Sequence, residues 1–133
     1  NDSVGAYAAK SLKEVTYHLR HSAEWVIRLG DGTEESHNKV QQSLNEIWEY
    51  TEDLFAQNEV DELLINEGII VDSNTLKPLW NDTINQVFER ATLIRPEDRF
   101  MQKGSLNGIH SENLGHLLAE MQFLPRAYPN DKW

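Results

Sequence analysis

The stretch VIRLGDGTEESH, residues 26–37, decides the fold of this chain. Its two glycines suit a helix C-terminus and a tight turn, so a helix that reaches this point must stop. Asp31 or Thr33 can then N-cap a second helix, whose first turn carries Glu34 and Glu35 at the positive end of the helix dipole. Because the turn is so short, the two helices are expected to pack antiparallel.

On both sides of this turn, core-type residues recur every three or four positions, as they do along one face of a helix. The stripe before the turn is Val4, Ala8, Leu12, Val15, Leu19, Ala23 and Val26, and the stripe after it is Val40, Leu44, Ile47, Thr51 and Leu54, with Trp48 and Phe55 alongside. The pattern predicts one helix over residues 4–29, a second that runs to about Phe55, and a helical hairpin over residues 3–56. Such a hairpin, with one broad apolar face, is half of a four-helix bundle.

Residues 57–133 are predicted to be helical with long connections. The expected elements are a short helix over 60–66, an extended connector over 69–71, a helix that starts near Asp72 with Pro78 in its first turn, a loop over 94–110 and a last helix over about 112–124. The last helix is expected to turn Leu114, Leu117, Leu118 and Met121 inward. The whole chain, 1–133, is therefore interpreted as one all-α and partial domain.

Composition and charge narrow the function classes. The net charge of -10 disfavours binding to phosphate backbones, and no apolar run approaches the ~20 residues that span a bilayer, so neither a nucleic acid nor a membrane is an expected partner. The chain has no cysteine, which excludes disulfides and iron–sulfur ligation and fits a cytoplasmic location. It also lacks an initiator Met, while the helical pattern already runs at Val4, so we expect a fragment or processed product of a longer protein.

Two constellations in the hairpin are candidates for metal binding. Glu14, His18, His21 and Trp25 are spaced by four, three and four residues along one side of the first helix, where a Glu–His pair can share a metal or simply hydrogen-bond. Glu34 and His37 fit the Glu-x-x-His spacing of di-iron carboxylate bundles.

Hairpin geometry argues against combining these pairs in one site. Glu14 precedes Gly30 by sixteen residues, which places it ~24 Å from the turn at ~1.5 Å per residue. At that level the second helix presents Ile47 and Trp48 inward, so hydrocarbon occupies the position of a metal ligand. His37 continues the apolar stripe before Val40 and is interpreted as a partly buried, hydrogen-bonded histidine, so metal binding is the less favoured interpretation of both pairs.

A third acidic and histidine group lies near the C-terminus. Glu112, His116 and Glu120 are four residues apart and share one face of the last helix. Such a group is more often a solvated or salt-bridged face than a metal site. No nucleophile elbow, phosphate loop or dinucleotide fingerprint is present in the sequence.

Two long stretches together resemble a known family. The first is AKSLKEVTYHLR, residues 9–20, which continues through Trp25 to RLGDGT at 28–33, and the second is GIHSENLG at 108–115, followed by LAEMQ at 118–122, Arg126, Pro129 and Trp133. They resemble the C subunits of bacterial phenylacetyl-CoA 1,2-epoxidases, over essentially all 133 residues and the second half of the family chain. The resemblance implies a ferritin-like fold and a structural, non-catalytic subunit of a monooxygenase complex of phenylacetate catabolism, a pathway of aromatic compound degradation.

The same resemblance implies where the cofactor and the partners belong. Iron is expected in the catalytic subunit that this chain would bind and support, and none in this chain. The rival hypothesis is a di-iron enzyme that uses Glu14, His18, Glu34 and His37 with ligands from the missing half, and a weaker one is an acidic adaptor. We also expect that two copies could pair through the exposed hairpin face, since large exposed apolar patches are usually covered by association.

Overall fold

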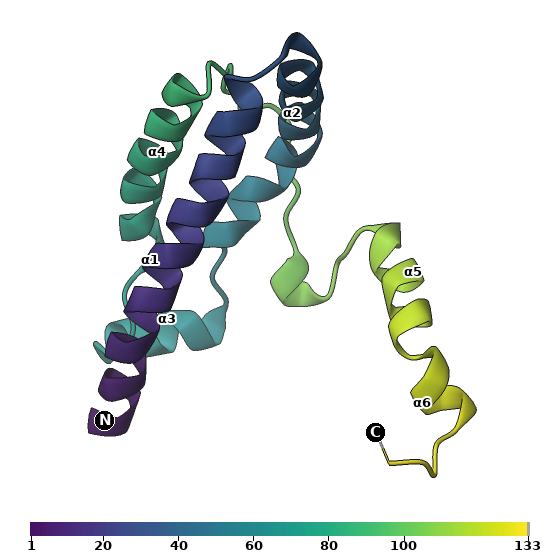
Figure 1. Cartoon of the computed structure of the whole chain (residues 1–133). Coiled ribbons are helices and arrows are strands. Elements are labelled where there is room, and N and C mark those ends of the chain that lie inside the picture. The colour runs from purple at the N-terminus through teal and green to yellow at the C-terminus, as the bar shows by residue number, and fades with distance from the viewer. Residues whose placement is uncertain (133) are drawn as a thin grey trace.

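The first two helices form the predicted hairpin. The computed structural model describes residues 1–132, and Trp133, which contributes to the resemblance, lies outside them. Helix α1 (Asp2–Gly30) ends at the glycine turn, and α2 (Glu34–Ile47) reverses direction and returns beside it (Figure 1). Thr33 is the N-cap of α2 and accepts a hydrogen bond from the Ser36 backbone N–H at 3.2 Å, as the sequence predicts.

The second predicted helix changes its geometry partway. It continues past Ile47 as a 3-10 segment, η1 (Trp48–Phe55), rather than as an α-helix. The Glu49 carbonyl accepts a hydrogen bond from the backbone N–H of Gln102 at 2.7 Å, and the Thr51 hydroxyl donates to the Trp48 carbonyl. Contacts from a distant loop and from a side chain thus occupy carbonyls that an α-helix would use internally.

The next two helices largely agree with the pattern. Helix α3 (Glu59–Asn66) begins with a capping box between Asn58 and Asp61, and α4 (Ser73–Arg90) is N-capped by Asp72. Pro78 lies in the interior of α4, so its predicted place in the first turn is wrong, because the helix already begins at Ser73. The exposed Asn74 carbonyl therefore lacks the usual helical donor. Residues 1–132 contain no β-strand, and 69–71 form a connector.

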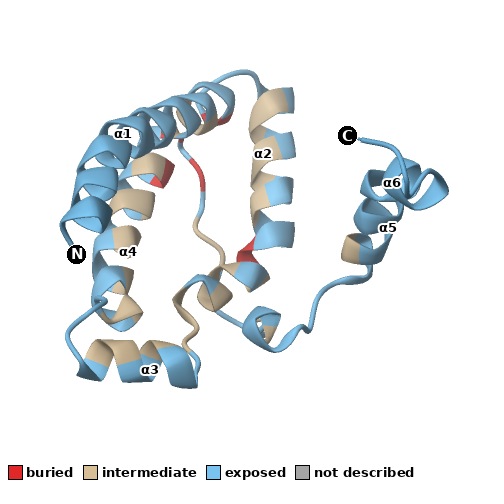
Figure 2. Cartoon of the chain, turned by 90° about the horizontal axis from the view of Figure 1, so that it is seen from below, coloured by how far each residue is buried: buried red, intermediate tan, exposed pale blue. Residues whose placement is uncertain are grey.

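The core is small and lies where α1, α2, η1 and α4 meet. Its buried members are Trp48, Phe88, Ala91 and Leu93, and Val26, Ile27, Val40 and Leu44 pack partly against them. Figure 2 shows this burial concentrated between the upper end of α1, α2 and the end of α4. The N-terminal part of the α1 stripe lies outside this core, since Val4, Leu12, Val15 and Leu19 are 51–65% exposed.

The C-terminal region differs most from its prediction. After the short segment η2 (Ser105–Asn107), helix α5 (Glu112–Met121) breaks at Gln122 and continues as α6 (Phe123–Ala127). The inward orientation predicted for Leu117, Leu118 and Met121 is wrong, because all three are exposed and α5 packs mainly against α6 rather than against the core helices. Figure 1 shows this arm extending away from the body of the chain.

Among residues 1–132, no helix is both long enough and apolar enough to span a bilayer.

Candidate functional site

His37 braces the turn of the hairpin. Its Nδ1 lies 2.7 Å from the Gly30 carbonyl oxygen, and because a carbonyl can only accept, Nδ1 carries the proton and donates. The side chain is half-buried, so the interpretation of His37 as a partly buried, hydrogen-bonded histidine is confirmed. This hydrogen bond ties the first turn of α2 to the last residue of α1.

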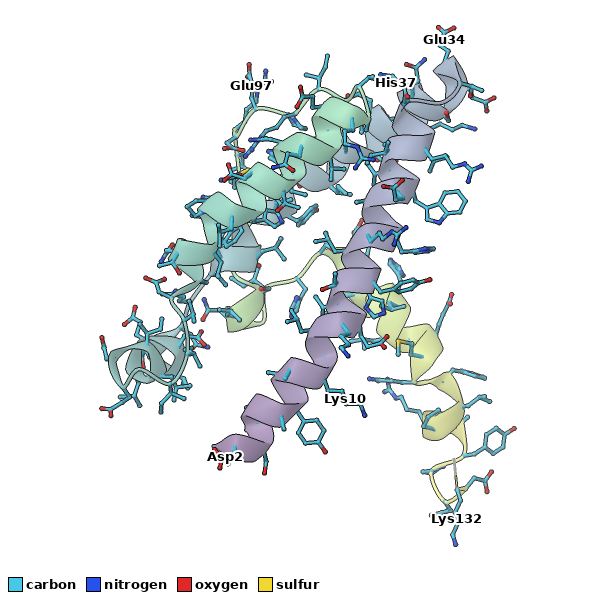
Figure 3. All side chains as sticks on the ribbon, turned by 60° about the vertical axis from the view of Figure 1, so that its left-hand side comes forward. Asp2, Lys10, Glu34, His37, Glu97 and Lys132 are labelled. Carbon is cyan, nitrogen blue, oxygen red and sulfur yellow. The ribbon has the colours of Figure 1, made fainter. Side chains whose placement is uncertain are left out.

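Glu34 lies at the same end of the molecule but points elsewhere. Figure 3 labels Glu34 and His37 together at the turn, where α2 begins. Glu34 is exposed in the first turn of α2, next to Glu35, whose carboxylate forms an ion pair with Lys39 at 2.6 Å. Glu34 is therefore placed to interact favourably with the helix dipole in solvent.

The polar side of α1 forms an aromatic row rather than a ligand cluster. The rings of Tyr17 and His21 are stacked with centroids 6.0 Å apart, and His21 meets Trp25 edge-on at 6.4 Å. The Arg28 guanidinium lies 5.8 Å from the centre of the Trp25 ring, which extends the row to the turn. Glu14 and His18 are exposed on the same helix.

The candidate residues do not assemble into one metal site. Among residues 1–132, no three His, Asp or Glu side chains are close enough together to hold a metal ion. Glu112, His116 and Glu120 are exposed on α5, in the arm that leaves the body. Since a di-iron centre draws a carboxylate from each of two helices and a carboxylate with a histidine from each of two more, this part of the chain does not by itself supply the donor set.

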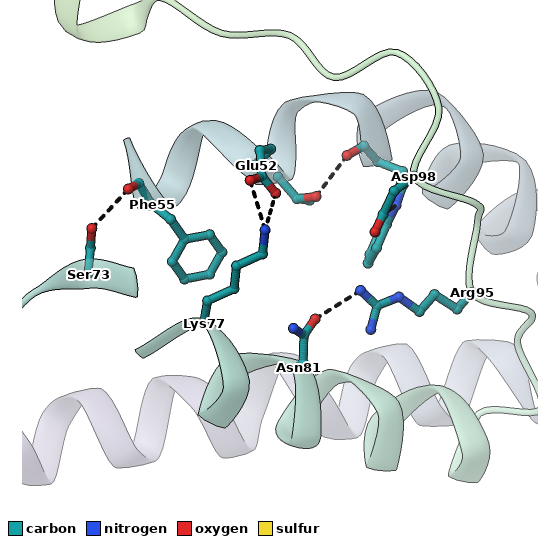
Figure 4. A network of polar contacts seen from close by, with 9 residues as sticks. Glu52, Phe55, Ser73, Lys77, Asn81, Arg95 and Asp98 are labelled. Carbon is teal, nitrogen blue, oxygen red and sulfur yellow. Dashed lines mark hydrogen bonds and ion pairs between the residues drawn. The ribbon is translucent and has the colours of Figure 1, made fainter. Parts of the chain in front are cut away.

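The most elaborate side-chain arrangement was not predicted from the sequence. It surrounds Trp48, whose indole N–H donates to the Asp98 carboxylate at 2.8 Å and whose ring carries the Arg95 guanidinium at 4.8 Å from its centre. Arg95 also donates to Asn81 and Asn85 of α4 at 2.8 and 2.9 Å. Figure 4 shows Arg95 and Asp98 on the loop that follows α4, with Arg95 bonded to Asn81 of α4.

A second cation occupies the other end of the same interface. The Lys77 ammonium donates to both carboxylate oxygens of Glu52, at 2.6 and 2.7 Å, and lies 5.8 Å from the centre of the Phe55 ring. The Ser73 hydroxyl donates to the Phe55 carbonyl nearby (Figure 4). Both cations are engaged with carboxylate, amide or aromatic partners, so this arrangement braces η1 against α4, which is a structural role.

Two carboxylates are held in their ionised form by local donors. Hydrogen bonding from Ser105 and then from the Gly104 backbone N–H lowers the pKa of Asp53 below its usual value. The Asn74 backbone N–H and the Gln57 amide lower the pKa of Asp72 in the same way. Both are anchor points: Asp53 fixes the loop before η2, and Asp72 caps α4.

Beside Trp48 the body of the chain is hollowed by an open apolar groove of about 370 Å³. Helix α1 contributes Val26, α2 contributes Val40, Leu44 and Ile47, and α4 contributes Trp80 and Ile84. The groove therefore has walls on three helices.

Comparison with known proteins gives consistent results. The family described as phenylacetic acid catabolic protein matches residues 1–133. The chain is 42% identical over 130 residues to the C subunit of 1,2-phenylacetyl-CoA epoxidase from Escherichia coli (strain K12). That alignment covers 98% of this chain and 52% of the relative, so the chain spans about half the length of the curated protein that it matches.

Proposed function

This chain belongs to the phenylacetic acid catabolic protein family, and from that membership we propose that it is part of a structural, non-catalytic subunit of a phenylacetyl-CoA epoxidase in phenylacetate catabolism. The observation that carries the proposal is the 42% identity to the C subunit of such an epoxidase along 98% of the chain. A cytoplasmic location is part of the proposal. The protein would bind and support a catalytic subunit that holds the iron.

The side chains support a bracing role. The arginine and lysine between η1 and α4 are both engaged in ion pairs, amide hydrogen bonds or aromatic contacts. His37 is used to hold the hairpin turn. The described residues thus offer interlocked helices and an open apolar groove, which are features of a scaffold that docks other helices.

One observation favours a second candidate, a di-iron oxygenase that uses Glu14, Glu34 and His37 with ligands from another part of the protein. Histidine ligands of metals usually donate the second ring N–H to a carbonyl or carboxylate, which leaves the other nitrogen free to bind the metal. His37 donates Nδ1–H to the Gly30 carbonyl, so Nε2 is the ring nitrogen that would bind a metal.

Iron analysis of the complete protein, alone and in complex with its catalytic partner, tests the proposal. The expected result is almost no iron in the protein alone and iron in the complex at the stoichiometry of the catalytic subunit. Iron bound stoichiometrically by the protein alone would contradict the proposal.

A matched variant separates the two candidates. In His37→Asn the amide nitrogen can take the place of Nδ1 as a donor to Gly30, whereas nothing replaces Nε2. We expect this variant and Glu34→Ala to retain epoxidase turnover within a few-fold. A loss of ~100-fold or more with normal assembly would support the di-iron candidate instead.

A further inference from the structure

The arm formed by α5 and α6 is joined to the body through a short turn that Asp53 holds. The two carboxylate oxygens of Asp53, on η1, accept the backbone N–H groups of Gly104 and Ser105 at 3.2 Å each. Among residues 1–132, each hydrogen bond formed beyond Ser105 joins residues within the turn or within the arm. Asp53 is therefore the last hydrogen-bonded anchor of the chain before the arm.

The turn is closed on itself, and the chain is free directly after it. The Gly104 carbonyl accepts the Ile109 N–H at 3.0 Å, and Gly104 has a φ of 118°, a backbone conformation that suits glycine. The next backbone hydrogen bond of the described chain joins the Leu114 N–H to the Ser111 carbonyl, where α5 begins. Residues 110–111 thus form a swivel on which the arm can turn relative to the anchored turn.

His110, the first residue of this swivel, shares a hollow of about 290 Å³ with Asp53. Tyr50 of η1 and Lys103 line the same hollow. Lys103 precedes the Asp53 anchor in the chain, so its charge stays in place when the arm turns. His110 follows the anchor, so it is a titratable group whose position depends on the arm.

Asp53 offers His110 a lasting negative charge. Hydrogen bonding from Ser105 and then from the Gly104 N–H lowers the pKa of Asp53, and a positive charge on His110 lowers it further. Asp53 therefore stays ionised at about pH 5, where a histidine side chain takes up a proton. A carboxylate has about four lone-pair sites, so the two backbone donors leave room for a ring N–H.

The other charged groups around the swivel have different roles. Glu49, beside Tyr50, accepts a hydrogen bond from the Gln102 amide and raises the pKa of Tyr50, which keeps that phenol uncharged. Glu112 lies in the first turn of α5 and travels with His110, so attraction between these two cannot tie the arm to the body. His116 and Glu120 lie further along α5 and are exposed.

We propose that His110 and Asp53 form a proton-controlled latch that sets the position of the C-terminal arm. When His110 is neutral, the arm turns on the swivel. When the ring is protonated, it donates to the Asp53 carboxylate and holds the start of α5 against η1. The latch does not depend on the proposed epoxidase role, since both groups belong to this chain.

Pulsed electron paramagnetic resonance on the complete protein tests the latch. Spin labels attached at Gln86 of α4 and at Glu120 of α5, both exposed, report the distance between the body and the arm. Measurements at about pH 8 and about pH 5 span the range in which histidine changes its charge. A broad distribution of distances is expected at the higher pH and a narrower one at the lower pH.

Three histidine variants make the test specific. His110→Gln carries no charge at either pH and should keep the broad distribution at both. His110→Lys is charged at both and should give the narrow distribution at both. His116→Gln is a matched change on the same arm but outside the hollow, so the response to pH should remain. Circular dichroism checks that each variant keeps its helices, as expected for exposed positions.

Asp53→Asn keeps an acceptor oxygen but removes the negative charge, so the narrowing at low pH should disappear. A distribution that is the same at both pH values in the unmodified protein would overturn the proposal. A response that persists in His110→Gln or Asp53→Asn, or that is lost in His116→Gln, would overturn it as well, because the proton would then act at another group.

Discussion

Gly30 and Ala91 touch where α1 and α4 end. A Cβ added to Gly30 would lie 2.5 Å from the Ala91 carbonyl oxygen and 2.9 Å from the Ala91 Cβ. Both residues are buried, and the Gly30 carbonyl accepts the hydrogen bond from His37. One small residue thus sets the distance between two helices and positions the side chain that closes the hairpin turn.

Gly30→Ala is expected to destabilise the chain by about 1–3 kcal/mol, because the added methyl group meets backbone atoms that cannot rotate away. The free energy of unfolding from urea titration measures the loss. Gly5→Ala is the matched control, since a Cβ there meets nothing within 4 Å and alanine favours a helix. Equal stability of the two variants would show that α1 and α4 can separate freely.

His37→Ala is expected to lower the free energy of unfolding by ~0.5–1.5 kcal/mol, the usual net contribution of one intramolecular hydrogen bond. His37→Asn, which keeps a donor near Gly30, should lose less. Urea titration of the three proteins gives the comparison. If alanine and asparagine were equivalent, the bond from His37 to Gly30 would contribute nothing to stability.

Asp98→Ala is expected to cost ~1–3 kcal/mol because it removes the acceptor of the Trp48 indole N–H, and Trp48 is only 3% exposed. Asp98→Asn retains an acceptor oxygen and should recover most of the loss. Chemical unfolding of both variants measures the difference, and Glu97→Ala on the neighbouring exposed residue is the control. A smaller loss of stability in Asp98→Ala than in Asp98→Asn would contradict this account of the indole.

Lowering the pH is expected to reduce the free energy of unfolding, because Asp53 and Asp72 then become protonated. Both carboxyl groups have a folded-state pKa below the ordinary value of 3.8, so their contribution to stability is fully present above that value. It is lost as the pH falls from there through the depressed folded pKa. The stability gap between the unmodified chain and Asp53→Asn should therefore narrow on acidification, as urea midpoints at several pH values would show. If the difference in stability between the two proteins increased as the pH fell, the result would contradict a lowered pKa for Asp53.

The arm formed by α5 and α6 is expected to be the first part that a protease removes. The arm has few contacts with the body, and Lys103 and Glu112 are exposed at the segment that joins them. Brief digestion with trypsin or with a glutamate-specific protease should give a stable product that ends near these residues. Mass spectrometry identifies the ends, and unchanged unfolding of the product would show that the arm does not stabilise the body. Early cleavage within α2 or α4 would contradict this picture.

Local signals allowed much of the fold to be predicted from the sequence. The glycine turn, the Thr33 cap, the beginning of α4 near Asp72 and the short helix α3 all depend on residues within a few positions of one another. The interpretation of His37 succeeded for the same reason, since its partner Gly30 lies only one helical turn and a short loop away. The expectation that this chain holds no iron stays a prediction.

Features that depend on distant residues could not be predicted. Nothing near Trp48 in the sequence indicates that Asp98 will accept its indole N–H, that Arg95 will lie over its ring, or that Gln102 will donate to a carbonyl of η1. Leu117, Leu118 and Met121 have the spacing of a buried face, and the periodicity cannot reveal that the core helices lie elsewhere. Periodicity reports which face of a helix is apolar but not what covers it.

The loop after α4 has a further consequence for how this chain reaches its native state. Its anchors pair Gln41 with Ile94, Trp48 with Asp98 and Glu49 with Gln102, at separations of 53, 50 and 53 residues. Closing one loop of that length costs roughly 3–4 kcal/mol of chain entropy, beyond a constant, and the neighbouring pairs then form at almost no further entropic cost. The hairpin can form early from local contacts, whereas these anchors should form together in one late, rate-limiting step.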